Sequence, residues 1–185
     1  MKRVLLNDDS SIRSVIEGNQ YLIDINTPLL ANFVDDIEYG AKTDYFDNES
    51  NMFMSIGNPP TPNDTFDYVI KEWVDLRTLD QIKAQKWAEI KSERDRIEFG
   101  GFEFEGNIYD SDQVSQSRIM GAAVAGVDQV WTLADNTTVE LSASQLRQLY
   151  AALQAHIASV HERGRIARQL ILDVETKEQV ELVQL

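Results

Sequence analysis

The chain contains no cysteine among its 185 residues. Disulfide bonds, thiolate metal sites and a cysteine nucleophile are therefore excluded. Histidine is also scarce, because only His156 and His161 occur. On a helix, residues five positions apart point about 140° away from each other, so these imidazoles do not form the paired metal ligands that a spacing of four gives. We expect neither a metal ion nor another cofactor.

Basic residues are few, since 17 Lys and Arg stand against 31 Asp and Glu and give a net charge of −14. This charge repels nucleic-acid phosphates and anionic membrane surfaces, and it favours basic partners. No apolar run approaches the length of a membrane span, and Asp8 and Asp9 fall where a secretion signal needs an apolar core. We expect a soluble protein that binds neither nucleic acid nor a membrane.

The usual catalytic motifs are absent as well. The sequence has no phosphate-binding loop, no nucleophile elbow and no His-Glu-x-x-His pair. Asp110 and Asp112 resemble the start of a calcium loop, but Ser115 and Gly121 occupy the positions at which that loop needs glycine and glutamate. Capping of a helix explains the two aspartates better. The sequence therefore predicts a protein without enzymatic activity.

Acidic residues concentrate in the segment 1–75, which carries 14 acidic and five basic side chains. Short apolar runs at 4–6, 21–23 and 51–56 alternate with turn-forming residues, which predicts small strands and loops. A segment with so few apolar residues per turn is expected to pack against another surface, either the helical half of the chain or a partner subunit. We therefore predict an acidic, β-rich docking region over 1–75.

Two features subdivide this region. Aromatic and apolar residues on both sides of 47–51 predict one hairpin, and those of Phe66–Val74 predict a second. Three of the four prolines lie at 59, 60 and 62. They predict a rigid linker or an edge turn over 57–62, with a proline-rich ligand for an aromatic groove as the alternative.

Residues 76–185 predict a helical domain interrupted by two β-hairpins. Helix starts are indicated at Thr78, at Ser111 or Asp112, and at Ser142, where Gln145 completes a capping box. Gly106-Asn107 and Asp135-Asn136 are typical of tight hairpin turns. The expected elements are helices over 79–99, 113–127 and 143–174, with hairpins near 101–110 and 130–141. The predicted fold class is α+β, with a small strand-rich N-terminal region, three helices and two hairpins.

The last helix carries apolar or small residues at alternating spacings of four and three, which form one seam of heptad period. This seam comprises Leu146, Tyr150, Leu153, Ile157, Val160, Gly164, Ala167, Ile171 and Val174. It can associate with a second copy of the chain through the 143–174 helix, or it can pack against the helix over 79–99. The residues 174–185 that follow are expected to be a strand or a frayed helix end.

Several of these motifs resemble a known family in their order. A Lys-rich helix with Arg94-Asp95 precedes Gly100-Gly101-Phe102, then Tyr109–Asp112, the helix residues Ser115–Ile119 and a hairpin that begins at Trp131. From about Leu79 to about Arg165 the chain resembles a domain of unknown function encoded beside tail-fibre genes of tailed bacteriophages. The family has no established catalytic residues, so the resemblance implies a viral tail context and no active site.

The resemblance implies a structural component of a bacteriophage tail, attached at the tail fibre or baseplate and located in the virion tail after assembly in the host cytoplasm. The alternative is a tail-fibre assembly chaperone that leaves before the virion matures. Both expect tail-fibre or baseplate proteins as partners. Large aromatic side chains supply much of the energy of an interface. We therefore predict partner contacts at Tyr45, Phe46, Phe53 and Phe66, and at Leu153, Ile157 and Val160 if the seam is the contact.

Overall fold

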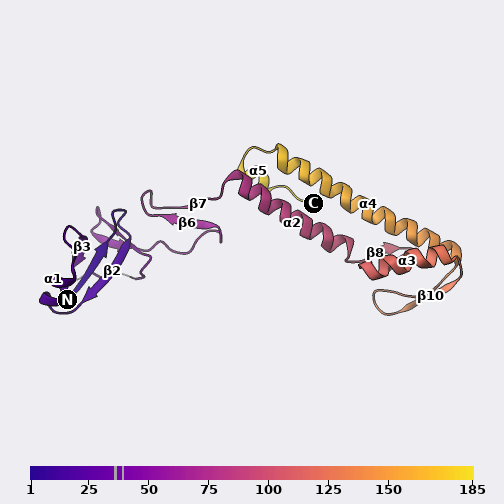
Figure 1. The fold of residues 1–185 in the computed structure, drawn as a ribbon, viewed down its shortest axis with the longest axis horizontal. Coiled ribbons are helices and arrows are strands. Elements are labelled where there is room, and N and C mark those ends of the chain that lie inside the picture. Colours follow the sequence, from indigo (N-terminus) through magenta and orange to yellow (C-terminus); the bar gives the residue numbers. More distant parts are fainter. Residues whose placement is uncertain (36, 39) are drawn as a thin grey trace. The chain divides into compact units, whose positions relative to one another are not determined.

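The computed structural model describes residues 1–35, 37, 38 and 40–185. The chain forms two compact units, Met1–Arg77 and Thr78–Leu185 (Figure 1). The first contains strands, hairpins and one short helix, and the second is mainly helical. The chain is thus a mixed α/β protein whose long helix lies near the C-terminus.

A three-stranded antiparallel sheet organises the first unit. Strand β1 (Lys2–Leu6) lies between β2 (Ile12–Glu17) and β3 (Asn32–Asp35), and helix α1 (Gln20–Asn26) connects the two outer strands. The side chain of Asn19 caps α1 by accepting a hydrogen bond from the amide of Leu22 at 3.0 Å. The apolar run 21–23 is therefore helical, and its assignment to a strand is wrong because this cap starts a helix.

Two hairpins of the same design complete the first unit. One pairs β4 (Tyr45–Asp47) with β5 (Met52–Met54), and the other pairs β6 (Asp64–Asp67) with β7 (Glu72–Asp75). In both turns, the last aspartate of the first strand accepts a hydrogen bond from the amide three residues later. Both predicted hairpins are present. The proline-rich segment 57–62 joins them, so it lies inside the first unit and does not link it to the second.

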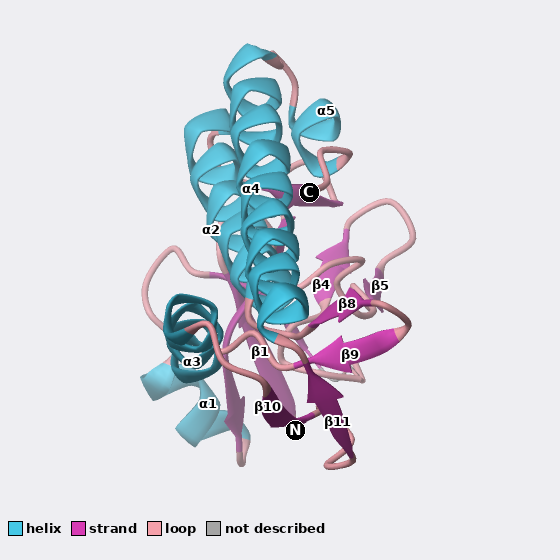
Figure 2. Ribbon diagram, turned by 90° about the vertical axis from the view of Figure 1, so that its right-hand side faces the viewer, coloured by secondary structure: helices cyan, strands magenta, loops and turns pink. Residues whose placement is uncertain are grey.

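Two long antiparallel helices form the frame of the second unit. Helix α2 (Leu79–Glu98) and helix α4 (Ala143–Asp173) lie side by side (Figure 2). Thr78 and Ser142 form the capping boxes that begin them, and Asp112 caps helix α3 (Gln113–Ala125). The C-terminal tail forms a fourth helix, α5 (Lys177–Glu181), begins with its own capping box at Thr176 and contacts α2. The sequence predicts three helices in this unit, whereas the structure has four.

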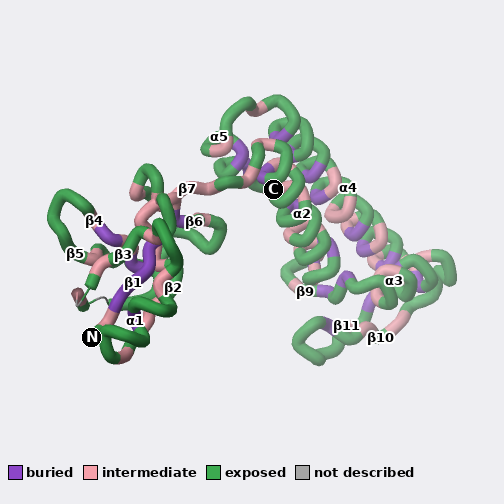
Figure 3. Tube along the Cα trace, turned by 60° about the vertical axis from the view of Figure 1, so that its left-hand side comes forward, coloured by how far each residue is buried: buried purple, intermediate pink, exposed green. Residues whose placement is uncertain are grey.

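The apolar seam of α4 packs within its own unit. One group of buried residues surrounds Leu146, Leu149 and Leu153, and another joins Ala167 and Ile171 to Ile90 of α2. Figure 3 shows these buried positions along α4. The two helices are close at Gly164, where a Cβ would lie 3.4 Å from Cδ of Arg94, in ordinary van der Waals contact. Of the two alternatives for the seam, the structure shows packing inside the chain.

The two hairpins of the second unit are β8 (Phe102–Phe104) with β9 (Asn107–Tyr109), and β10 (Gln129–Thr132) with β11 (Thr138–Leu141). Phe104 pairs with Asn107, so the turn between them is Glu105-Gly106, one residue earlier than predicted. Both turn residues have positive φ, 48° and 78°. A two-residue hairpin turn is present, as predicted. However, Asn107 is the first residue of β9, and Glu105 is the first of the two turn residues with positive φ.

Two glycines of α3 should respond in opposite ways to alanine. Gly121 lies inside the helix next to open space, so Gly121→Ala is expected to stabilise the second unit by about 1 kcal/mol through helix propensity. Gly126 ends the helix with φ 65°, where a Cβ is unfavourable, and Gly126→Ala is expected to destabilise it by about 1 kcal/mol. Thermal unfolding of the two variants measures both shifts, and equal shifts of the same sign would contradict this assignment.

Candidate binding surfaces

The predicted aromatic contacts of the first unit lie together, but they form its interior. Tyr45 stacks on Phe66 with ring centroids 5.8 Å apart, and Phe46 meets Phe53 edge to face at 5.3 Å. Phe66 also contacts Trp73 of its partner strand at 5.4 Å. Phe46 and Phe66 are buried, whereas Tyr45 and Phe53 are half-buried. These rings therefore join the hairpins to each other.

Phe46, Phe66, Leu153 and Val160 are buried inside their own units, so their side chains offer little surface to a partner. Ile157 is half-buried and packs against the core around Leu153. A partner can reach at most the exposed parts of Tyr45, Phe53 and Ile157. The accessible apolar area of the first unit lies elsewhere.

Helix α1 and the turn after it carry part of the exposed apolar surface of the first unit, and Met52, Met54, Val69, Ile70 and Leu76 are exposed as well. Only Ile23 of α1 is buried, while Tyr21, Leu22 and Ile25 are exposed. Leu29 and Leu30 are 97% and 102% exposed, as far into solvent as a side chain can reach. We call these residues the α1 surface: Tyr21, Leu22, Ile25, Leu29 and Leu30. The apolar residues within 21–30 were the available sequence signal for the α1 surface. Assigning 21–23 to a strand does not place these residues on one helix and the turn that follows it.

The backbone of this turn is strained. The amide of Ala31 donates to the carbonyl of Pro28 at 3.2 Å, which makes Leu29 and Leu30 the central residues of a β-turn. Leu30 has φ 66°, a conformation that favours glycine or asparagine and is unusual for a bulky residue. The Leu30 side chain is thus exposed to solvent, and its backbone has an unfavourable φ. Neither feature stabilises the isolated chain.

Arg3 fixes the two ends of this segment. Its Nε and Nη2 each donate to a carboxylate oxygen of Asp35 at 2.7 Å, while Nη1 donates to Oγ1 of Thr27 at 3.1 Å and to Asp24 at 3.4 Å. The guanidinium carbon lies 3.9 Å from the ring centre of Phe33. Because Thr27 precedes the turn and Asp35 ends β3, this single side chain positions the α1 surface relative to the sheet.

The Arg3 contact makes the first unit sensitive to acid. The hydrogen bonds from Arg3 lower the pKa of Asp35, and those to Asp35 raise the pKa of Arg3. A carboxylate with a lowered folded-state pKa contributes stability above its unfolded pKa of about 3.9, and this contribution is lost as the pH falls through the folded value. We expect the melting temperature of the first unit to fall with acidification below about pH 4, and to fall less steeply in Asp35→Asn. Equal pH profiles for both proteins would contradict the assigned role of Asp35.

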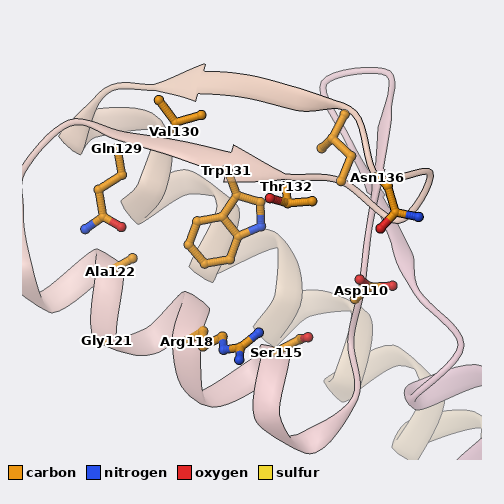
Figure 4. Close-up of a pocket in the computed structure, with 11 residues that line it drawn as sticks. Asp110, Ser115, Arg118, Gly121, Ala122, Gln129, Val130, Trp131, Thr132 and Asn136 are labelled. Atoms are coloured by element: carbon orange, nitrogen blue, oxygen red, sulfur yellow. The ribbon is translucent and has the colours of Figure 1, made fainter.

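An open cleft in the second unit is the other candidate. It has a volume of about 620 Å³ and lies between α3 and the β10–β11 hairpin (Figure 4). Trp131 packs against the unit's core and is half-buried in the cleft wall. Arg118 lies opposite on α3, and Gly121 leaves the space above the helix open.

Four polar side chains around this cleft have no partner within the described chain, whereas the hydroxyl of Ser115 donates to Asp112. Over residues 1–35, 37, 38 and 40–185, no hydrogen bond or ion pair joins Asp110, Arg118, Gln129 or Asn136 to another group through their side chains. Elsewhere in the unit, Arg94, Arg96 and Arg165 each contact a carboxylate. Arg118 acts only at longer range, where its charge helps to lower the pKa of Asp112 after the larger effect of the Ser115 hydroxyl. Donors and acceptors that bind no other protein group within the described chain therefore surround the cleft.

Sequence reasoning did not find the cleft. The sequence pattern assigns Asp110 to a helix cap or to the start of a calcium loop, whereas Asp112 makes the cap. The alternation of Gln129 and Trp131 along one strand was the available signal, since residues two apart share a face. The two histidines lie away from it: Nε2 of His156 is 3.1 Å from the carbonyl of Ile97, and Nε2 of His161 is 2.9 Å from Glu98.

Comparison with protein families matches residues 81–184 to a domain of unknown function, DUF4376. The chain belongs to the DUF4376 family. The match begins in the first turn of α2 and covers the cleft and α5, so the DUF4376 region is the second unit and the α1 surface lies outside it. No curated protein and no solved structure matches the chain.

Two further findings concern the described part of the chain. It contains no group of three or more side chains arranged to hold a metal ion. None of its helices combines the length and the apolar character needed to cross a bilayer.

Proposed function

We propose that this DUF4376 protein is a binding component of a bacteriophage tail that docks on a tail-fibre or baseplate protein through the α1 surface. The viral context comes from the order of motifs from Leu79 to Arg165, which resembles domains encoded beside tail-fibre genes. The docking role comes from the structure's first unit. The proposal assigns no catalytic step to the chain.

The observation that carries the docking role is the Leu29-Leu30 turn. Leu29 and Leu30 are fully exposed, and the backbone of Leu30 is strained at φ 66°. A partner that buries the two side chains gains the free energy of apolar burial. Exposed apolar clusters beside polar residues mark protein interaction sites. The α1 surface therefore meets the description of a contact centre better than the buried aromatic rings do.

Charge defines the kind of partner. The first unit carries 14 acidic and six basic side chains, and Asp24 and Asp35, which contact Arg3, stay partly exposed beside the α1 surface. Such a rim attracts basic side chains and speeds association with them. The partner surface is thus an apolar patch flanked by Lys or Arg.

Mass spectrometry of purified phage particles and of infected-cell lysates tests this function. A structural component is present in the particles in a fixed ratio to the tail-fibre protein. A chaperone co-purifies with the tail-fibre protein from lysate and is absent from the particles. Absence of the chain from both the particles and the fibre complex would refute the proposed function.

A further inference from the structure

We propose that the cleft between α3 and the β10–β11 hairpin binds a neutral saccharide, with Trp131 as the platform for a pyranose ring. This site belongs to the second unit and is independent of docking through the α1 surface. The inference follows from the shape of the cleft, the support of its aromatic ring and the chemistry of its rim.

The platform is preorganised. Trp131 packs on the core that includes Leu133, Leu141 and Leu149, so its ring has little freedom to lose when a ligand binds. The indole N–H makes no hydrogen bond in the described chain and is not among its buried unpaired atoms. A flat apolar surface with an accessible N–H donor beside it matches a pyranose ring, which has a face of C–H groups and an edge of hydroxyls.

The rim supplies the matching polar groups. Arg118 offers only donors, Asp110 only acceptors, and Gln129 and Asn136 offer both. Sugar hydroxyls donate and accept, so a mixed rim satisfies them without leaving a group unpaired. The two charges are opposite and cancel, and the net charge of −14 disfavours an anionic ligand. A neutral saccharide therefore fits better than a phosphate or a polyanion.

The size of the cleft agrees with this class. A volume of about 620 Å³ lies within the usual range of small-molecule sites, and the open side lets a chain of sugar units continue past the pyranose on Trp131. Gly121 contributes to the room, because a Cβ at this position would meet nothing within 4 Å.

Saturation-transfer NMR with maltotriose, cellotriose, mannotriose and N-acetylglucosamine trimer tests the proposal on the full chain. At least one sugar should receive magnetisation from the wild-type protein. Trp131→Ala should weaken its affinity by about thirtyfold, as truncation of a central aromatic anchor does. Because Trp131 also supports the core, Gly121→Leu is the second variant: it fills the cleft from a helix with space for the side chain, and it should abolish transfer while the protein stays folded.

Val124→Ala serves as the matched control, since Val124 is exposed on α3 and does not line the cleft. It should bind the sugar as the wild type does. Absence of transfer from all four sugars overturns the proposal, and so does binding that Gly121→Leu leaves unchanged. If Gly121→Leu prevents capture of a tail protein and no sugar binds, the cleft is a protein contact and the saccharide assignment is wrong.

Discussion

Leu153→Asp is expected to unfold the second unit. Leu153 is fully buried in the cluster that contains Leu146, Leu149 and Phe102, where a carboxylate is removed from water. Burial of an unpaired charge costs about 4 kcal/mol or more, a large part of the stability of a domain this size. Far-UV circular dichroism should show loss of most of the helical signal.

Ile166→Asp is the matched control on the same helix, because Ile166 is exposed. Its effect on stability should stay within about 0.5 kcal/mol. If Leu153→Asp instead leaves a fully helical chain and only changes its oligomeric state, the seam is a contact between copies and its packing within the unit is contradicted.

The double variant Leu29→Ser/Leu30→Asn should stabilise the first unit and weaken partner binding at the same time. Asparagine tolerates positive φ, so the change at Leu30 relieves backbone strain of about 1 kcal/mol. Loss of two exposed apolar side chains from the centre of a contact should reduce affinity by about thirtyfold or more. Thermal unfolding measures the first effect, and calorimetric titration with the tail-fibre protein measures the second.

Val69→Ser/Ile70→Ser is the control for this pair. Both residues are exposed in the β6–β7 turn of the same unit and lie outside the α1 surface. The control should keep the wild-type affinity. A double variant at Leu29 and Leu30 that binds as tightly as the wild type would remove the α1 surface from the contact.

Local chemistry made much of the second unit predictable. Thr78 and Ser142 carry complete capping boxes, and strong helix patterns follow them, so both helix starts fall at the expected residues. The predicted hairpin turn lies one residue too late. Both Glu105-Gly106 and Gly106-Asn107 contain the glycine that the turn needs, and only the pairing of the strands decides between them. The tail helix α5 was missed because five residues give too short a pattern to recognise.

The binding surfaces were less predictable, because exposure depends on tertiary packing. Aromatic composition indicated Phe46 and Phe66 as contacts, but in a unit with few apolar residues the same rings are needed for the core. Heptad spacing in α4 is equally compatible with a partner helix from another copy and with α2. The cleft depends on how α3 packs against the hairpin that follows it, and the sequence does not show that side chains such as Arg118 and Trp131 face each other across this gap.

Quantitative mass spectrometry of particles assembled with each variant tests docking through the α1 surface most directly. In phage that carry Val69→Ser/Ile70→Ser, the ratio of the chain to the tail-fibre protein should equal the wild-type ratio. Phage that carry Leu29→Ser/Leu30→Asn should contain little of the chain, although this variant is folded and expressed. Equal incorporation of the two variants would contradict the account.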